Sequence, residues 1–463
     1  MYKAYITALT NVRKHPNADR LLLADVFGNT VCVSTDYTEG QVGVYFPTDG
    51  QLSVEFAEKN NLVRKKDENG NNIGGYMDPE KRNVTAIRLR GEKSDGLFLP
   101  LSCLAYTGVN LDTLTVGNVI DGTVNGHDIC QKYIPRTNHR QGHVTNGNKT
   151  RKHKVSTAPL FAEHADTEQL AYNLSAFHAG DEIEITLKMH GTSQRTGYLP
   201  VLKGYKRTLL DRLLRREGKP IYDWDYVTGT RRVVLDTYAE GGYYGDNKFR
   251  EPHAKAFEGK LNKGETVYYE VVGFTDTGAP IMSSASNAKL QDKEFVKQYG
   301  AETVFSYGCK PVVSIDCDDV QSDIYVYRMT MTNEDGFVVD YHPNFMRYRC
   351  EQMGVKCVPV FYKGFLPKQP YGEATEEQKE MGYLSSGPIS HGEYVKNIAE
   401  QFYDGPDPIG KTHVREGVVV RIVDRPKFTA YKHKNFSFKV LEGIAKVEAE
   451  APDMEEAQDV NEI

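Results

Sequence analysis

The sequence contains no long hydrophobic segment. Within its 463 residues there is no run of about 18 apolar residues, the length needed for a membrane-spanning helix, and no apolar stretch follows Met1-Tyr2-Lys3. Hydrophobic residues make up 39 % of the chain, which is enough for a buried core. We therefore expect a cytoplasmic protein of two or three domains that has no membrane partner.

Metal-binding and nucleotide-binding signatures are also missing. The seven cysteines include no Cys-x-x-Cys pair, and neither Cys309/Cys317 nor Cys350/Cys357 has histidines at zinc-finger spacing. This pattern favours buried thiols over a zinc site. The chain has no GxxxxGK loop followed by Ser or Thr, and no GxGxxG after a strand. Any nucleotide chemistry must therefore use another architecture.

Charge is small in total but unevenly spread. The net charge of -6 argues against a general nucleic-acid coat. Residues 446–463 are rich in acids, which predicts a disordered tail, whereas residues 136–155 are basic and contain glycine and asparagine. The basic segment predicts a linker, and it has two possible functions: solvated spacer or contact with a phosphate backbone.

Residues 1–135 are predicted to form a small β-barrel. Short alternating apolar runs at 21–26, 30–34, 42–46, 84–89 and 96–100 are separated by turn residues. Two local patterns, HPNADRL at 15–21 and RLRG at 88–91 followed by SDGL at 94–97, resemble OB-fold modules appended to some tRNA-binding proteins. The resemblance implies a module that binds nucleic-acid strands, although a barrel that only packs on its neighbour remains an alternative.

The second region, residues 156–445, contains a lysine in a position suited to phosphate chemistry. Ile183, Ile185 and Leu187 alternate with polar residues, which predicts a strand that ends at Lys188. A turn with His190 and Gly191 follows, so the ammonium group can approach a phosphate closely. A nucleophilic lysine must be neutral, which requires cations nearby. Alone, Lys-x-x-Gly is a common pattern, and a surface lysine would be its ordinary explanation.

Two later strands carry polar residues where apolar ones are expected. Glu270 lies in the middle of the apolar run 267–274, and burying an unpaired carboxylate is costly, so it must be paired or reserved for a ligand. Alternation over 323–331 places Ile324, Val326 and Arg328 on one face, with Tyr325, Tyr327 and Met329 on the other. Tyr327 could stack on a base or belong to the core.

The last two motifs combine a carboxylate with lysines. Glu416 and Gly417 open a β-branched strand, where a carboxylate suits a divalent metal or a lysine. Lys432 and Lys434 lie two residues apart and share a face if they are in a strand. Their repulsion would be relieved by an anion such as a triphosphate, or by solvent at an edge strand.

Together, these motifs resemble a known enzyme superfamily. Segments at 188–192, 270–273, 325–327, 416–421 and 432–435 look like the five ordered motifs of the covalent nucleotidyltransferases, which include DNA ligases, RNA ligases and mRNA-capping enzymes. The continuation His190-Gly191-Thr192 is similar to nick-sealing RNA ligases, and an OB module before the catalytic domain resembles one branch of them. The resemblance implies an α+β protein, with an N-terminal OB-type β-barrel followed by a nucleotidyltransferase domain of antiparallel sheets and flanking helices.

The resemblance also implies a role for each motif residue. These are Lys188 as the nucleophile that carries AMP, His190 and Gly191 in the nucleotide site, Glu270 on the ribose, Tyr327 on adenine, Glu416 on Mg²⁺ or Mn²⁺, and Lys432 and Lys434 on the phosphates. Arg231 would hold the ribose or a nucleic-acid phosphate, with Arg195 and Arg232 as competitors for that role. The implied activity is ATP-dependent joining of RNA 3′-hydroxyl and 5′-phosphate ends by a monomer.

Some segments do not fit the pattern. Residues 203–226 look like an insertion, with a basic amphipathic helix expected at 209–216. Residues 340–410 are divergent, with helices expected at 376–383 and 394–402, and Lys439 rivals the two phosphate-binding lysines. A DNA ligase, a capping-type transferase and a non-catalytic RNA-binding protein remain alternatives. The histidine at 190 and the short segment after Lys439 argue against the first two.

Overall fold

The computed structural model describes residues 2–48, 50–65, 74–133, 157–164, 167–209, 211, 214, 218–231, 233–235, 238, 247–312 and 319–442. The expected basic linker at 136–155 and acidic tail at 446–463 lie outside these residues, as does most of the helix expected at 209–216. No helix in the described residues is long and apolar enough to cross a membrane. All six cysteines described are free thiols.

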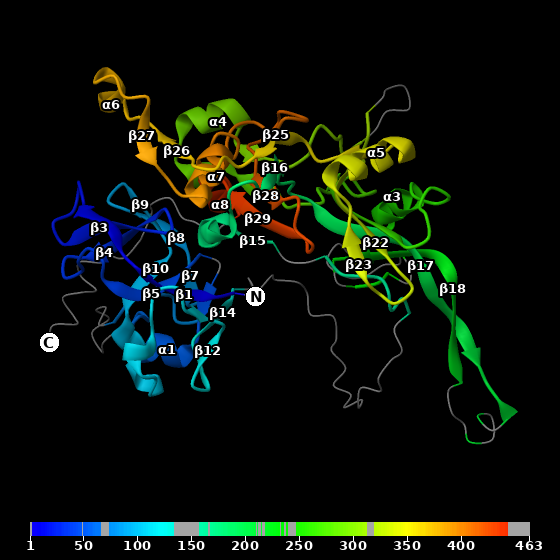
Figure 1. Ribbon diagram of the computed structural model, residues 1–463, viewed down its shortest axis with the longest axis horizontal. Coiled ribbons are helices and arrows are strands. Elements are labelled where there is room, and N and C mark those ends of the chain that lie inside the picture. The colour runs from blue at the N-terminus through cyan, green and yellow to red at the C-terminus, as the bar shows by residue number, and fades with distance from the viewer. Residues whose placement is uncertain are drawn as a thin grey trace. The chain divides into compact units, whose positions relative to one another are not determined.

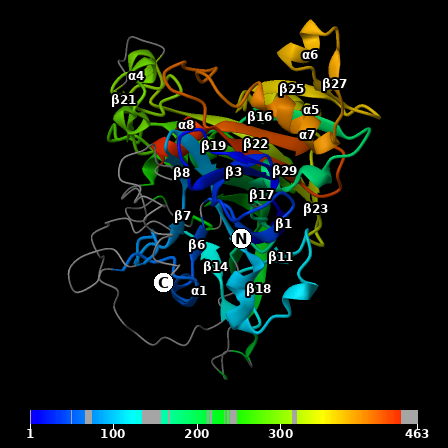
Figure 2. The ribbon, with the colours of Figure 1, turned by 90° about the vertical axis from the view of Figure 1, so that its left-hand side faces the viewer.

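The chain divides into two compact units. The first contains residues 1–144, 287–293 and 439–463, and the second contains residues 145–286 and 294–438. Both are built mainly from antiparallel sheets with a few helices (Figures 1 and 2). The expected mixture of helices with mostly antiparallel sheets is therefore confirmed.

Five small antiparallel sheets make up the first unit. Their strand orders are β10-β5-β1-β11, β2-β3-β4, β14-β6-β7, β8-β9 and β12-β13. The strands are β1 (Ala4–Ala8), β2 (Thr10–Lys14), β3 (Leu21–Val26), β4 (Asn29–Ser34), β5 (Val42–Phe46), β6 (Gly50–Leu52), β7 (Asn83–Val84), β8 (Ala86–Leu89), β9 (Glu92–Asp95), β10 (Leu97–Pro100), β11 (Val119–Ile120), β12 (Thr123–Val124), β13 (His127–Asp128) and β14 (Cys130–Lys132). Helix α1 (Val54–Lys59) starts at Ser53, whose side chain accepts a hydrogen bond from the Phe56 amide.

The predicted apolar runs at 21–26 and 42–46 coincide with β3 and β5, whose inward side chains contribute to the cores of this unit. The run at 84–89 is divided between β7 and β8. No closed barrel is formed by the strands of the described residues, so the OB-type barrel is not confirmed.

The two sequence patterns that suggested the OB module contact each other. His15 is buried, with its Nε2 3.1 Å from the carbonyl oxygen of Leu89. Asn17 donates a hydrogen bond of 2.8 Å from its side chain to the carbonyl of Arg90, at the turn between β8 and β9. These contacts give both patterns a structural role in joining two parts of the unit.

Two larger sheets form the second unit. The five-stranded sheet has the order β15-β29-β28-β16-β25, and the other has the order β18-β17-β19-β22-β23, with β24 pairing to β22. The strands are β15 (Glu168–Gln169), β16 (Glu182–Leu187), β17 (Thr192–Lys206), β18 (Lys219–Thr230), β19 (Glu265–Gly273), β22 (Ser322–Thr332), β23 (Val338–Asp340), β24 (Lys356–Cys357), β25 (Val360–Phe365), β28 (Gly417–Ile422) and β29 (Thr429–Lys434), with the small pairs β20 (Ala285–Ser286) and β21 (Glu302–Thr303), and β26 (Tyr371–Glu373) and β27 (Ser385–Pro388).

Helices cover one face of each large sheet. The helices are α3 (Glu251–Lys255), α4 (Lys293–Tyr299), α5 (Pro343–Met353), α6 (Glu376–Glu380), α7 (His391–Glu400) and α8 (Phe436–Leu441). Met346 and Cys350 of α5 pack into the core of β19 and β22, whereas Val395 and Ile398 of α7 pack on β16 and β28. These apolar faces leave the opposite faces of the strands free to carry polar residues.

The expected helices at 376–383 and 394–402 occur as α6 and α7. Helix α7 begins at Ser390, whose side chain accepts from the Glu393 amide while the Glu393 carboxylate accepts from the Ser390 amide. Helix α6 lies between β26 and β27, and Figures 1 and 2 show it projecting from the unit. The predicted divergent region therefore contains a covering helix and a projecting arm.

Candidate nucleotide site

The candidate site begins where β16 ends. Ile183 and Ile185 of this strand are fully buried in the core, so Glu184 and Thr186 face the opposite way. Lys188 follows the strand, and its amide donates to the carbonyl of Gly417 at 3.0 Å. The alternation that predicted an outward Lys188 is present, and it places this lysine in a pocket rather than in solvent.

The pocket lies within the second unit and has a volume of about 880 Å³, including open space at its mouth. Both large sheets contribute to it, and its lining includes Glu184, Thr186, Lys188, Ser193, Arg231, Glu270, Tyr327, Val419, Arg421 and Phe428. Four of the predicted site residues, Lys188, Arg231, Glu270 and Tyr327, come from four separate segments and share this one pocket.

A buried carboxylate connects Lys188 to a second lysine. Glu416 is only 2 % exposed, and its Oε1 lies 2.6 Å from Lys188 Nζ and 3.1 Å from Lys434 Nζ. Burial alone would raise the pKa of Glu416, but the two ammonium groups outweigh it and hold this pKa well below its usual range. Its second oxygen, Oε2, has no hydrogen-bond partner and lies 3.5 Å from His190 Nδ1.

His190 contacts the Glu416 carboxylate and is held in place by aromatic neighbours. Its ring packs edge-on against Phe305 and Phe438, at centroid distances of 4.5 and 4.7 Å, and its amide donates to the Tyr307 hydroxyl at 2.7 Å. His190 and Gly191 do not line the pocket. The geometry therefore fits His190 as a residue that positions Glu416, rather than one that contacts a nucleotide.

Two glycines are required by close backbone approach. A Cβ on Gly191 would lie 2.6 Å from the carbonyl oxygen of Val271, and one on Gly417 would lie 2.1 Å from the carbonyl oxygen of His433. Gly417 also has a φ of 146°, which other residues rarely adopt. These contacts explain why a glycine follows both the lysine and the glutamate motifs.

Glu270 occupies the middle of β19 and faces the pocket. It is the direct cross-strand partner of Ser193, which also lines the pocket. Burial raises the pKa of Glu270 to about 7 despite the opposing charge of Lys188, and its Oε2 has no hydrogen-bond partner. A buried carboxylate oxygen without a donor is a ready acceptor for a ligand hydroxyl.

The pairing of β22 is irregular at Tyr327, which lies on the strand face opposite the core residue Val326 and lines the pocket. The pairing with β19 shifts register between Tyr268 and Tyr269, so that Val326 and Arg328 have partners and Tyr327 has none. As a result, Met329 joins Ile324 and Val326 in the core, and the simple alternation expected for this strand is wrong. The Tyr327 hydroxyl lies 2.9 Å from Ser193 Oγ.

The arginines considered for the ribose or phosphate contact differ in their surroundings. Arg231 lines the pocket. Arg195 is 2 % exposed, donates to the carbonyls of Thr230 and Phe161 at 3.1 Å, and stacks on the Phe161 ring. Arg195 therefore has a structural role, and Arg232 lies outside the described residues.

The three lysines considered as phosphate ligands, Lys432, Lys434 and Lys439, also differ in their contacts. Lys432 pairs with Val419 across the sheet, and Val419 in turn pairs with Thr186, so these three side chains form a row on one face of the sheet. Thr186 and Val419 line the pocket, whereas Lys432 does not. Lys434 contacts Glu416, whereas Lys439 lies 3.1 Å from the buried Asp95 within the first unit. Lys439 is thus engaged elsewhere, which leaves Lys432 and Lys434 as the phosphate candidates.

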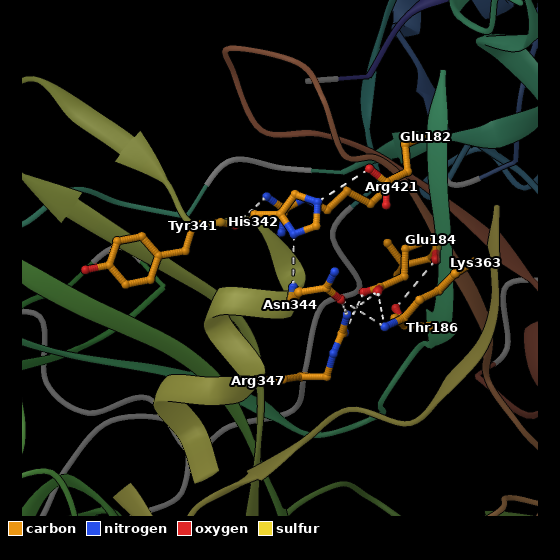
Figure 3. A network of polar contacts seen from close by, with 10 residues as sticks. Glu182, Glu184, Thr186, Tyr341, His342, Asn344, Arg347, Lys363 and Arg421 are labelled. Atoms are coloured by element: carbon orange, nitrogen blue, oxygen red, sulfur yellow. Dashed lines mark hydrogen bonds and ion pairs between the residues drawn. The ribbon is translucent and has the colours of Figure 1, made fainter. Parts of the chain in front are cut away.

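The sequence reasoning missed a polar network beside the pocket (Figure 3). Glu184 is 4 % exposed, and both its oxygens accept from Arg347 of α5, at 3.1 and 2.8 Å. Lys363 lies 3.5 Å from Glu184, and Asn344 accepts from Arg347 at 2.8 Å. Strand alternation with Lys188 was a signal for Glu184, but its arginine partner is 163 residues away and could not be anticipated.

No protein-family model and no curated protein matches the chain. Solved structures of Naegleria gruberi RNA ligase do match. The complex with PPi has a TM-score of 0.53 at 17 % identity, covering 94 % of this chain and 97 % of that one. A variant with ATP and Mn gives 0.53 at 16 % identity over 95 % and 99 %, and a variant with AMP and Mn gives 0.52 at 16 % over 95 % and 98 %. This chain therefore has the fold of the Naegleria gruberi RNA ligase over nearly its whole length.

Proposed function

We propose that the chain is an ATP-dependent RNA ligase, in which Lys188 carries AMP between ATP and a 5′-phosphate RNA end. The observation that carries this proposal is the position of Lys188, in a pocket with Glu270, Tyr327 and Arg231 and 2.6 Å from the buried Glu416. The Naegleria gruberi RNA ligase of the same fold has been solved with ATP, AMP and PPi, which are the substrate and products of this chemistry.

Lys188 forms a phosphoramidate in the first step. Its Nζ lone pair attacks the α-phosphorus of ATP, the bond from that phosphorus to the bridging oxygen of pyrophosphate breaks, and Nζ loses its protons to solvent. Lys188 Nζ lies 2.6 Å from the carboxylate of Glu416. Attack on the α-phosphorus requires that Lys188 leave Glu416, while Lys434 stays as the partner of that carboxylate.

The remaining steps transfer AMP and seal the RNA. A 5′-phosphate oxygen attacks the phosphorus of lysyl-AMP, which regenerates Lys188 and leaves a 5′-5′ pyrophosphate linkage on the RNA. The RNA 3′-hydroxyl then attacks the 5′-phosphate, and AMP leaves. Lys188 acts in the first two steps only, so a variant without it would still seal an RNA that is already adenylylated.

The other pocket residues bind the nucleotide. Glu270 accepts a hydrogen bond from a ribose hydroxyl, Tyr327 stacks on adenine, and Arg231 contacts the ribose or an RNA phosphate. Lys432 and Lys434 neutralise the phosphates, as their shared strand face permits. The guanidinium groups of Arg328 and Arg421 lie 4.6 and 5.0 Å from the centre of the Phe428 ring, and these contacts hold the aromatic wall of the same pocket.

The donor set also fits a divalent cation. Glu416 presents an oxygen without a hydrogen-bond partner, and carboxylate oxygens suit Mg²⁺ and Mn²⁺. The proposed ligand is Glu416, with ATP phosphates completing the set. A bound cation would supply charge neutralisation to the transferring phosphoryl group. The first unit is proposed to be a nucleic-acid-binding module of OB type, and residues 136–155 its linker to the catalytic domain.

The test is incubation of the purified protein with α-labelled ATP and Mg²⁺ or Mn²⁺, followed by a denaturing gel. We expect label on the wild type and none on Lys188→Ala, while Lys255→Ala, which changes an exposed helix lysine, retains it. Absence of label on protein first treated with pyrophosphate would contradict the proposal. Sealing of nicked duplexes with RNA or DNA at the 3′-hydroxyl then separates an RNA ligase from a DNA ligase.

A further inference from the structure

A long hairpin extends from the pocket and has no part in the nucleotide chemistry. Strands β17 and β18 pair from Gln194 and Thr230 out to Lys206 and Lys219, and Figure 1 shows them projecting beyond the rest of the second unit. Ser193, at the inner end of β17, lines the pocket. At about 3.3 Å per residue, the tip lies about 40 Å along the strand from Ser193.

Aromatic packing stiffens the arm. Tyr198 and Tyr226 are direct cross-strand partners with stacked rings 4.8 Å apart, and Trp224 lies 6.0 Å from Tyr198. Lys263 sits over the Trp224 ring at 5.3 Å, and the Tyr226 hydroxyl accepts from the Gly259 amide at 2.6 Å. Because these rings pack on one another and on the body of the unit, they hold the inner half of the arm. The pairing continues to Lys206 and Lys219, with a register shift between Leu202 and Gly204.

The tip concentrates positive charge. Lys206 and Lys219 are direct cross-strand partners, and both are exposed, as is Arg207. Like charges directly opposite in a sheet destabilise it unless an anion lies between them. Further along the arm, by contrast, Lys203 is paired with Asp225. Asp211 lies near Arg207 and Lys219 and offsets one of the three positive charges. In a chain of net charge -6, the described residues of the tip therefore keep an excess of two positive charges, which suits a polyanion.

We propose that the β17–β18 tip binds the phosphate backbone of the RNA duplex on one side of the nick. The inference rests on the proposed function, because a duplex that presents its nick to Lys188 and runs along the arm meets Lys206, Arg207 and Lys219. An A-form RNA duplex rises less per base pair than the about 3.4 Å of B-form DNA, so the contact falls somewhat more than about a dozen base pairs from the nick. The contact is with phosphates and independent of sequence.

The test measures binding of a fluorescent nicked RNA duplex to the full chain without ATP, as a function of salt. The tip variant is Lys206→Ala/Arg207→Ala/Lys219→Ala. The matched control, Lys255→Ala/Lys297→Ala/Lys379→Ala, removes the same charge from three exposed helix positions. With arms of about 20 base pairs, we expect the tip variant to lower the slope of log K against log salt by about three, at about one per phosphate contact, and the control to leave it unchanged.

Substrate length supplies a second readout. With duplex arms of about six base pairs, which cannot reach the tip, the tip variant is expected to bind as the wild type does. A wild-type slope for the tip variant on long arms would overturn the proposal, and so would an equal loss on short and long arms. Competition by polyglutamate as effective as competition by RNA would also overturn it, since the tip would then serve acidic proteins.

The proposed function is tested separately in the same preparations. The tip variant is expected to take up AMP from ATP at the wild-type rate, because its substitutions lie far from Lys188. If the wild type takes up no AMP but its RNA binding depends on the tip, the ligase proposal fails and the RNA-binding arm remains. If AMP uptake is normal and the salt slope does not depend on the tip, the arm proposal fails alone.

Discussion

Replacement of Glu270 by glutamine should stabilise the ligand-free protein in a way that depends on pH. Burial raises the pKa of this carboxyl from 4.5 to about 7, so its charged form is disfavoured in the folded state. The folded protein holds the proton over a range in which the unfolded chain has released it. Glu270 therefore leaves the free energy of unfolding unchanged below about pH 4.5 and lowers it progressively between pH 4.5 and 7. Above about pH 8 the full reduction is present.

The magnitude follows from the shift. About 2.5 units at about 1.36 kcal/mol each give up to about 3 kcal/mol at pH 8.5. Glu270→Gln removes the charge and keeps the shape, so it should gain up to this amount at pH 8.5 and less than about 1 kcal/mol at pH 5. Urea denaturation of wild type and variant at the two pH values measures the difference.

Activity should change in the opposite direction. Loss of the charged acceptor for a ribose hydroxyl is expected to lower the rate of AMP uptake about tenfold to a hundredfold, since a charge-assisted hydrogen bond contributes about 1.5–3 kcal/mol. Glu294→Gln, at a side chain that is 85 % exposed, serves as the control and should change neither property. A Glu270→Gln protein less stable than wild type at pH 8.5, or equally stabilised at pH 5, would refute the reasoning.

Three further substitutions test the site. Glu416→Gln leaves the ammonium groups of Lys188 and Lys434 without their counter-charge and should cost about 3 kcal/mol in the free energy of unfolding, measured with urea; an unchanged midpoint would contradict the ion pairs. Gly191→Ala forces a Cβ against the backbone of β19 and should cost about 1–3 kcal/mol by thermal melting, with Gly180→Ala, which has open space but a positive φ, as a less damaging comparison. Tyr327→Phe should retain ATP affinity, whereas Tyr327→Leu should weaken it about tenfold or more in a binding titration, because stacking contributes about 1–3 kcal/mol per base; equal affinities would exclude stacking.

Local patterning predicted the parts of the second unit that consist of regular strands. The alternation around Ile183 and Ile185 correctly indicated a strand with Lys188 on the opposite side from its core face, because one face of β16 packs on α7. Glu416 and Lys188 are far apart in the sequence, so the distance between their side chains in the fold could not be predicted. Their 2.6 Å contact arises because β28 pairs with β16 along its length.

The periodicity of the sequence could not predict irregular strands or contacts between residues far apart in the chain. The register shift at Tyr327, which puts Met329 rather than Arg328 on the core face, interrupts a strand whose sequence alternates without a break. Glu184 of β16 meets Arg347 of α5, a helix that packs on β22 and β24 of the other large sheet, and neither residue stands in a recognisable motif. In the first unit, short apolar runs predicted strands but did not determine how those strands join, and the expected closed barrel is absent from the described residues.

The most direct test of the account is to find the residue that carries AMP. The wild-type protein would be stripped with pyrophosphate, incubated with ATP and Mg²⁺ or Mn²⁺, digested, and its peptides mapped by mass spectrometry under conditions that preserve the phosphoramidate. The account predicts a single AMP on the peptide that contains Lys188, and none in Lys188→Ala. AMP on Lys432 or Lys434 instead, or a wild-type protein that gains no AMP, would contradict it.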